Sequence, residues 1–380
     1  MDYTKIVPPA NIWADFHSIN KDNSAIDWFD PRQSPFVISG LAFFSENEDF
    51  YRFPKNIPFD LPIEVVKRGM GPSGAQIRFS ALTARVSIRV KLKAPPYNSC
   101  NTSTLCSSGF DLYASDGDGK YAMCGAVDFD TSKADYGSTL LNLRSPKKLD
   151  FILNFPLRDR VESIYIGLDK GASPVSPPPY KTDERIVVYG GSIMQGYCAS
   201  RPGMTFTNIL SRRLNQEVIN LGVSGNGKCE REVAYAVAKV DRTSLLIISA
   251  EGNCPTPEYI TEHMTDFISA YREIHPYVPI AVMGYMKTGD ELINDDAREA
   301  RLKKKKSMTK IVDSFKKGGD ENIYYFDGEE FTEEEYDYVF EGHSAALECT
   351  VDTVHKSDLG FWLMSNGVIR KMKEFGLLKQ

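Results

Sequence analysis

A serine near the middle of the chain occupies a position suited to a nucleophile. Ser192 follows the apolar run 185–189 and two glycines, so it is predicted to lie at a turn from a strand to a helix. The first N–H groups of a helix have no partner within it and can surround a reactive oxygen. A phosphate-binding loop is disfavoured because no third glycine completes G-x-G-x-x-G and no Gly-Lys-Ser/Thr follows. A nucleophile and a purely structural turn both remain open.

A carboxylate and an imidazole lie three positions apart near the other end of the chain. Asp352 can fold back on His355, accept a hydrogen bond from one ring nitrogen and leave the other facing a serine. The alternative is that Asp352 caps a short helix and His355 is a surface residue. None of the other histidines has such a partner at this spacing, and these are His17, His263, His275 and His343.

Two further loops offer hydrogen-bond donors for a developing oxyanion. Gly222 follows one predicted strand and Asn253 follows the next. The two N–H groups of Ser192 and Gly222 and the amide of Asn253 would make three donors, each worth about 3 kcal/mol in acyl transfer. Asn226 and Asn253 are equally compatible with turns, because Asn tolerates a left-handed backbone. The other loop residues expected to line the site are Gly191, Asn226 and Glu251.

The elements around these loops alternate between strand and helix. Short apolar runs followed by helical periodicity predict right-handed crossovers and an α/β fold with a doubly wound parallel sheet. Reactive groups are then expected at the carboxyl ends of the strands. The predicted strands are 185–189, 218–221, 245–248, 280–284 and 322–327, and the predicted helices are 205–214, 229–240 and 257–274.

The first half of the chain has a different pattern. From about residue 36 to 168 we expect short strands joined by turns, without a convincing helix. Residues 84–92 and 160–168 alternate apolar and polar side chains, and two Asp-Gly pairs within 115–120 favour a hairpin. This half is therefore predicted to be an all-β domain, a β-sandwich or jelly roll.

Four prolines between Pro174 and Pro179 separate the two patterns. Such a run cannot occupy a helix or the centre of a sheet, so it predicts a stiff extended connector. The expected organisation is a β-sandwich domain over 1–172, a proline-rich linker over 173–184 and an α/β domain over 185–380.

Composition excludes several classes of protein. The chain has 380 residues, 42% of them apolar and 25% charged, which is globular and long enough for two domains. No run approaches the roughly 18 apolar residues of a membrane span. The net charge of −6 weighs against nucleic acid or anionic lipid as the main partner. The lysine run within 301–306 is interpreted as a solvated helix face, with nucleic-acid binding as the alternative.

The N-terminus and the cysteines favour a reducing compartment. Residues 1–9 lack a basic region followed by an apolar run, so no signal peptide is expected and a cytoplasmic location is predicted. The number of cysteines is odd and no CxxC pair is present, which favours reduced thiols and no zinc site. A bridge between Cys100 and Cys106 is the alternative. The seven cysteines are Cys100, Cys106, Cys124, Cys198, Cys229, Cys254 and Cys349.

The ordered set of loop motifs resembles the SGNH hydrolase superfamily, also called the GDSL-type lipases and acylhydrolases. Ser192 matches the nucleophile block, Gly222 the second block and Asn253 the third. Asp352 and His355 match the Asp-x-x-His of the last block. The resemblance thus implies a catalytic triad of Ser192, His355 and Asp352 on an SGNH-type doubly wound sheet.

The blocks depart from the usual family pattern at several places. Gly191 stands where an acidic residue is usual, and Asn253 lies in Glu-Gly-Asn-Cys-Pro in place of Gly-x-Asn-Asp. Thr353 and Lys356 replace the Gly and Pro often found around the histidine. None of these changes removes a catalytic atom.

The resemblance extends to the first half of the chain. Residues 108–113, Ser-Gly-Phe-Asp-Leu-Tyr, are similar to the Gly-x-Asp-Leu-Tyr signature of a β-rich domain that precedes one subgroup of these hydrolases. Residues 50–54 and 77–79 fit the same pattern, and 220–227 match the second block of that subgroup.

The resemblance implies a serine esterase that removes a small acyl group, acetyl above all, from an acylated saccharide. No metal or organic cofactor is implied. Two alternatives remain: an acyltransferase that passes the same acyl group to another alcohol, and a carbohydrate-binding protein whose hydrolase site has decayed.

Overall fold

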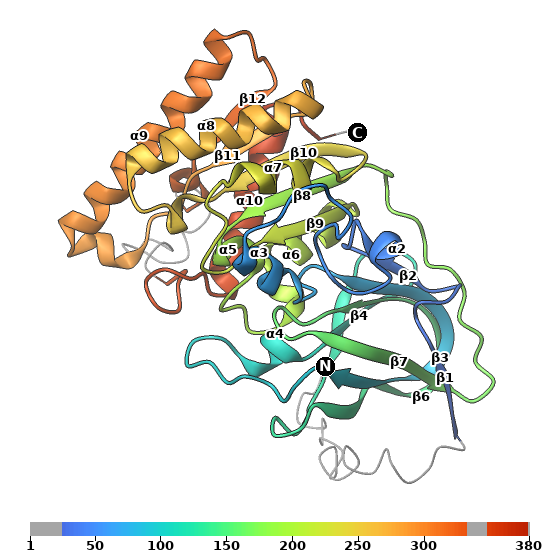
Figure 1. The fold of residues 1–380 in the computed structure, drawn as a ribbon. Coiled ribbons are helices and arrows are strands. Elements are labelled where there is room, and N and C mark those ends of the chain that lie inside the picture. The colour runs from blue at the N-terminus through green and yellow to red at the C-terminus, as the bar shows by residue number, and fades with distance from the viewer. Residues whose placement is uncertain (1–24, 333–347, 379–380) are drawn as a thin grey trace.

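A computed structural model describes residues 25–332 and 348–378 of the chain. Residues 1–9, His17 and His343, which entered the sequence predictions, lie outside the described residues. The described chain forms an antiparallel β-rich half followed by an α/β half, each built on its own sheet (Figure 1).

The second half contains a five-stranded parallel sheet. Its strand order is β12-β11-β10-β8-β9, and every neighbouring pair is parallel. The predicted doubly wound sheet is confirmed. Its strands are β8 (Arg185–Gly190), β9 (Glu217–Gly222), β10 (Thr243–Ser249), β11 (Ile280–Met283) and β12 (Ile323–Phe326).

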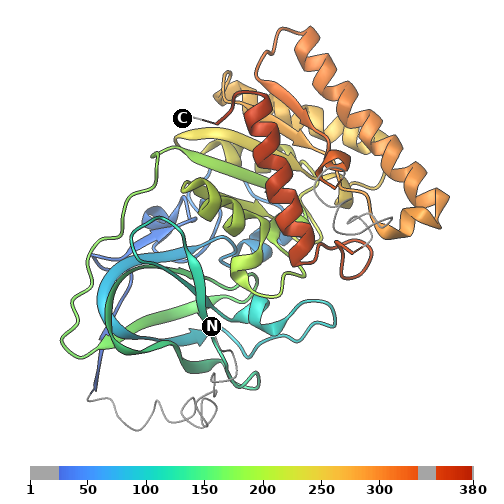
Figure 2. The ribbon, with the colours of Figure 1, turned by 180° about the vertical axis from the view of Figure 1, so that it is seen from behind.

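Helices cover both faces of this sheet (Figure 2). Val187 and Tyr189 of β8 belong to one core, and Ile186 and Val188 belong to the core on the other face, which explains why the strand is continuously apolar. Helices α7 (Arg231–Ala238), α8 (Pro257–Ile274) and α9 (Asp295–Lys317) pack into the first core, and α6 (Phe206–Leu214) and α10 (Asp358–Glu374) pack into the second. No helix within 25–332 or 348–378 is both long and apolar enough to cross a membrane.

Strand β8 lies between β9 and β10, so the chain passes from β8 to β9 on one side and then crosses back to β10 on the other side, which reverses the direction of strand addition. In doubly wound sheets, ligands bind at this reversal, outside the carboxyl ends of the strands. The loops that follow β8, β9 and β10 therefore converge, and these loops carry the first three predicted blocks.

The first half contains a seven-stranded antiparallel sheet. Its main order is β1-β7-β3-β6-β4-β5, and β2 pairs with β3. The β-rich character is confirmed, but the expectation of uniformly short strands was wrong because β3 has 17 residues and β6 has 20. The strands are β1 (Ile26–Phe29), β2 (Val37–Ser39), β3 (Gln76–Leu92), β4 (Asp111–Ser115), β5 (Ala122–Ala126), β6 (Asp135–Asn154) and β7 (Val161–Asp169).

Local irregularity explains these differences. The β3–β6 register shifts between Thr83 and Arg85, so the Ser-Pro at 145–146 lies in a bulge that resembles a turn in the sequence. The absence of helices was also a wrong expectation. Helices of four to seven residues are too short to display a clear helical period, and they are α2 (Phe44–Asn47), α3 (Ile63–Gly69) and α4 (Thr104–Ser108).

The two halves share buried hydrogen bonds. The Arg52 guanidinium is 1% exposed and donates to the carbonyls of Asn220 and Gly222 at 2.9 and 2.8 Å. The proline-rich segment lies along the antiparallel half, where Val175 pairs with Ser80. The domain boundaries at 172 and 185 remain a prediction, since these contacts tie the segments on either side together.

Candidate active site

Ser192 begins the short helix α5 (Ser192–Gln195) directly after β8. Gly190 has φ 157°, and a Cβ there would lie 2.0 Å from the Ser249 carbonyl oxygen, so the turn requires glycine. The side chain of Ser192 is half-buried, and its Oγ lies 2.9 Å from Nε2 of His355. The structure therefore brings together two predicted residues that are 163 positions apart.

Asp352 and His355 lie in a tight loop before α10. The loop is closed by a hydrogen bond from the Val351 N–H to the His355 carbonyl and by Thr353 at φ 65°, where the family usually has glycine. His355 Nδ1 lies 2.8 Å from Asp352 Oδ2. Asp352 is not a helix cap, because Ser357 caps α10. Ser192, His355 and Asp352 thus form one hydrogen-bonded chain.

The carboxyl group of Asp352 is held in its ionised form. Partial burial alone would raise its pKa, but hydrogen bonds from the backbone and ring of His355 and from Asn101 lower the pKa to about 2. An ionised carboxylate fixes the proton of His355 on Nδ1 and leaves Nε2 able to accept the proton of Ser192.

Sequence reasoning missed Asn101. Its Nδ2 donates to Asp352 Oδ2 at 2.7 Å across 251 positions of sequence. Asn101 lies in a polar loop of the antiparallel half, where no local pattern distinguishes it from a turn former.

Asn253 lies in the short helix η4 (Glu251–Asn253) and contacts the turn before Ser192. A Cβ on Gly191 would lie 2.3 Å from Asn253 Nδ2, so the position that is usually acidic in the family has no room for a side chain here. Asn253 Nδ2 also donates to the Asn226 carbonyl, which connects the loops after β9 and β10. The Asn253 amide and the Asn226 carbonyl therefore lie next to Gly191, the residue before Ser192, and their part in a site stays a prediction.

The prediction that Gly222 supplies a free N–H was wrong. Its N–H donates to Asn220 Oδ1 at 2.9 Å, and its Cα packs against the backbone of Gln195. The N–H of Gly225, in the same loop, has no hydrogen-bond partner among the described residues. Gly225 is exposed at φ 73°, and this left-handed turn was signalled in the sequence by Ser-Gly-Asn.

Glu251 does not line an open site, contrary to expectation. Its side chain is buried and accepts the N–H of Tyr285. Burial raises its pKa to about 7, although that hydrogen bond and the charge of Lys304 act in the opposite direction. Lys304 Nζ donates to the carbonyls of Glu251 and Cys254, so the lysine run is not a uniformly solvated face.

The buried carboxyl group of Glu251 predicts a pH dependence of stability. Because its pKa is raised from 4.5 to about 7, the folded state binds more protons than the unfolded state between these values, and stability falls as pH rises through this window. Glu251→Gln should remove this loss, worth up to about 3 kcal/mol. Urea unfolding at pH 5 and pH 8 measures it.

Glu262→Gln on the exposed side of α8 is the matched control and should leave the pH dependence of unfolding unchanged. An equal decline in stability between pH 5 and pH 8 in wild type and Glu251→Gln would contradict the assignment.

One group of side chains in the described residues has the composition of a metal site. Ligand atoms of Cys198, Asp352 and His355 lie within 4.8 Å of one another. Both ring nitrogens of His355 are already engaged, and burial raises the pKa of the Cys198 thiol to about 11. A protonated Cys198 thiol and a His355 ring with both nitrogens hydrogen-bonded are better suited to hydrogen bonding than to metal ligation.

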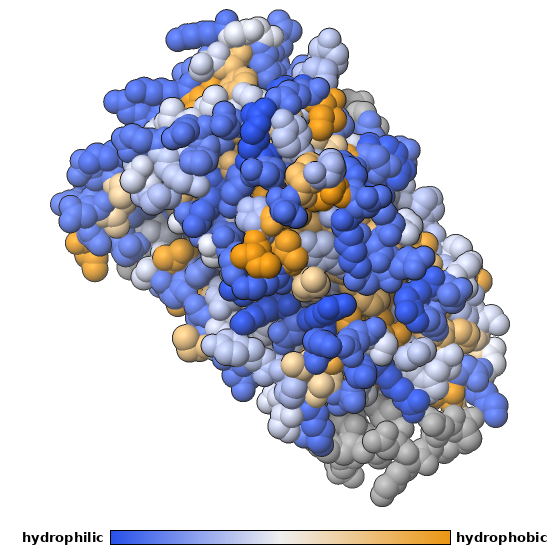
Figure 3. Space-filling model, viewed as in Figure 1, coloured by the Kyte–Doolittle hydropathy of each residue, from blue (hydrophilic) through white to orange (hydrophobic). Residues whose placement is uncertain are grey.

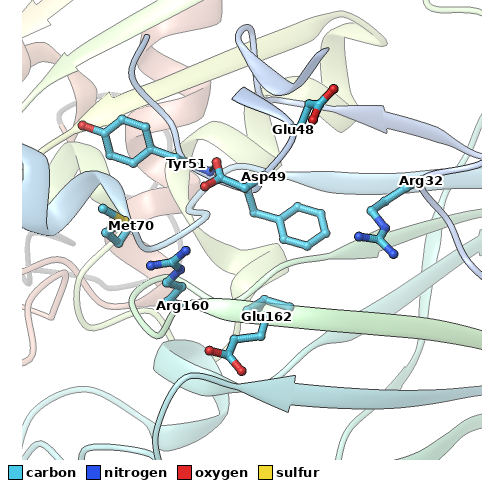
Figure 4. Close-up of a pocket in the computed structure, with 9 residues that line it drawn as sticks. Arg32, Glu48, Asp49, Tyr51, Met70, Arg160 and Glu162 are labelled. Carbon is cyan, nitrogen blue, oxygen red and sulfur yellow. Dashed lines mark hydrogen bonds between the residues drawn. The ribbon is translucent and has the colours of Figure 1, made fainter. Parts of the chain in front are cut away.

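A cavity of about 240 Å³ in the antiparallel half is separate from these loops (Figure 4). It is lined by charged, aromatic and aliphatic side chains, with no serine, cysteine or histidine among them. The face of the molecule shown in Figure 3 is mostly hydrophilic, with hydrophobic side chains gathered near its middle. The lining residues are Arg32, Glu48, Asp49, Phe50, Tyr51, Met70, Arg160, Val161 and Glu162.

Comparison with protein families gives two matches. The profile of the GDSL-like lipase/acylhydrolase family matches residues 183–373. The profile of the GxDLY N-terminus of SGNH-hydrolase-type esterases matches residues 26–173. A search of curated proteins finds no match.

Several solved structures share this fold over most of the chain. A protein described as a GDSL-like lipase from Bacteroides ovatus is 29% identical, with a TM-score of 0.82 over 93% of this chain and 99% of that one. The salicylyl-acyltransferase SsfX3 of a tetracycline biosynthetic pathway is 17% identical, with a TM-score of 0.67 over 94% and 99%. A family two carbohydrate esterase from Clostridium thermocellum, in complex with cellohexaose, is 15% identical, with a TM-score of 0.55 over 80% and 94%.

Proposed function

Because the chain belongs to the GDSL-like lipase/acylhydrolase family, we propose that it is a serine esterase that hydrolyses small acyl esters, acetyl esters above all, of a carbohydrate. The family predicted from the sequence is confirmed, as is the GxDLY-type N-terminal region. The hydrogen-bonded chain Ser192–His355–Asp352, with distances of 2.9 and 2.8 Å, is the observation that carries the proposed chemistry.

In the proposed mechanism Ser192 is the nucleophile and His355 the general base. Nε2 of His355 takes the hydroxyl proton as Oγ bonds to the ester carbonyl carbon, and Asp352 stabilises the resulting imidazolium. The imidazolium then protonates the departing alcohol, which leaves an acyl group on Ser192. Water, deprotonated by His355, attacks this acyl-enzyme and releases the carboxylic acid and free Ser192. These steps need no metal or organic cofactor.

Donors near Ser192 support stabilisation of the tetrahedral oxyanion. As the first residue of α5, Ser192 has an N–H without a partner inside the helix. The Asn253 amide lies beside Gly191, and we assign the third donor to the N–H of Gly225, because that of Gly222 is engaged. Each such donor is worth about 3 kcal/mol in acyl transfer.

The carbohydrate part of the proposal is supported by fold similarity to carbohydrate esterases. The Clostridium thermocellum enzyme was solved with cellohexaose, but at 15% identity it shares only the fold. The acetyl preference rests on the family resemblance of the sequence blocks.

A panel of esters tests both parts of this proposal. We expect hydrolysis of 4-nitrophenyl esters to be fastest for acetate and to fall with acyl length, and acetate to be released from acetylated oligosaccharides. Chromogenic assays and detection of free acetate measure these rates. Preference for long acyl chains without acetate release from any saccharide would contradict it.

An acyltransferase is the second candidate, favoured by the shared fold of the salicylyl-acyltransferase SsfX3. The same acyl-enzyme would then be attacked by an alcohol other than water. A burst of 4-nitrophenol followed by turnover only after an alcohol acceptor is added would support transfer, and steady hydrolysis in buffer would exclude it.

A further inference from the structure

The loop between β3 and α4 extends from the antiparallel half to the loop that carries Asp352 and His355. In Figures 1 and 2 the cyan segment before α4 lies beside the orange-red loop before α10. Asn101 Nδ2 donates to Asp352 Oδ2 at 2.7 Å, and Ser99 Oγ lies 2.7 Å from Asn101 Oδ1. Asp352 is thus held between His355 on its own loop and Asn101 on the other half of the protein.

The chemistry of the partners fixes the orientation of the Asn101 amide. An ionised carboxylate only accepts hydrogen bonds, so the amide must turn its NH₂ group toward Asp352. Its oxygen then faces Ser99, whose hydroxyl donates to it. Donation to a charged acceptor is among the stronger kinds of protein hydrogen bond.

The same loop also contacts the other side of His355. Ser99 Oγ lies 3.1 Å from the hydroxyl of Tyr197, and the Tyr197 ring packs against the imidazole with centroids 4.9 Å apart. Thr102 is buried next to Cys198, the residue that follows Tyr197. The 99–102 segment therefore supports both the carboxylate and the imidazole.

We propose that Asn101 is a positioning residue that fixes Asp352 against His355, so that the antiparallel half supplies a fourth member of the Ser192–His355–Asp352 chain. This inference rests on the proposed function. In this assignment the antiparallel half takes part in catalysis because its residue Asn101 holds Asp352 in position.

Loss of the amide donor has a predictable electrostatic sign. Without it the pKa of Asp352 rises from about 2 toward its ordinary value of 3.8, and the carboxylate attracts a protonated His355 more strongly. Of the described residues, those facing His355 from other elements are Ser192, Tyr197 and Cys198, all neutral groups. The acid limb of the kcat/KM profile, which reports the general base of the free enzyme, should therefore move to higher pH.

Two substitutions and one control in the same loop test the inference. Asn101→Leu keeps the shape of the side chain and removes the donor, and should lower kcat about tenfold with KM changed less than about twofold. It should also raise the acid limb by several tenths of a pH unit. Asn101→Asp places a second carboxylate beside Asp352, so it should lower kcat further and move the acid limb to a still higher pH. Asn98→Ala, which among the described residues loses a hydrogen bond from Thr104, should leave rate and profile unchanged.

A measurement independent of turnover separates this inference from the proposed function. NMR titration of the His355 ring protons should give a higher midpoint in Asn101→Leu than in wild type, whether or not a given ester is hydrolysed. An inactive wild-type protein would contradict the proposed function, while the NMR titration of His355 would still test the role of Asn101. An unmoved His355 midpoint would overturn the inference, as would an unmoved acid limb accompanied by reduced thermal stability.

Discussion

Ser192→Ala is expected to lower the turnover of 4-nitrophenyl acetate by about 10⁴-fold or more while the protein stays folded. Alanine removes the Oγ that forms the acyl-enzyme, and the remaining donors only position water. The substitution removes one half-buried hydroxyl, whose hydrogen-bond partner among the described residues is His355, so the core is untouched. Steady-state rates check the fall in turnover, and far-UV circular dichroism of the same preparation checks that the protein is folded.

Ser200→Ala is the matched control for this experiment. Ser200 lies eight positions along the chain, is exposed and hydrogen-bonds to Asp358 instead of the Ser192–His355–Asp352 chain. Its loss should leave turnover within about twofold of wild type. Equal activity of Ser192→Ala and wild type would mean that another group is the nucleophile.

Asp352→Asn is the second large effect we expect, a fall in kcat of about 10²- to 10⁴-fold. An amide no longer compels the Nδ1 tautomer of His355, and its NH₂ group would face either His355 or the NH₂ group of Asn101. The stabilising contribution of Asp352 is present above pH 3.8 and is lost as pH falls toward 2, because its pKa is lowered in the folded state. Since Asp352 is partly exposed, thermal unfolding at pH 7 should change by only a few degrees.

Asp358→Asn, six positions further on at the start of α10, controls for loss of a carboxylate in this region. It should retain wild-type kcat. A loss smaller than about tenfold in Asp352→Asn would indicate that another group orients His355.

Features with a local physical signature were predictable from the sequence. Strands β8 to β12 are buried on both faces, and continuous apolar runs report such burial directly. Asp352 and His355 are three positions apart, so their contact requires only one tight loop. Ser192 was predicted because a strand, two glycines and a helix start follow one another along the chain.

Features that depend on long-range packing were not predictable. Gly222 matched a sequence block, but only the fold shows that the Asn220 side chain takes its N–H. Lys304 was expected to be solvated, yet the packing of α9 places it on the carbonyls of Glu251 and Cys254. A hydrogen bond between distant segments leaves no periodicity in either of them.

The sequence by itself determined the α/β scaffold and the family, and it predicted Ser192, Asp352 and His355 as site residues, because hydrophobic period and short motif spacing are local properties of the chain. Only the tertiary structure decided how the β-rich half meets that scaffold. Arg52 reaches Gly222 across 170 positions and Asn101 reaches Asp352 across 251. Both contacts exist because loops and short helices of the first half pack against the α/β half, and the free energy of that packing is spread over many residues with no pattern that marks these two.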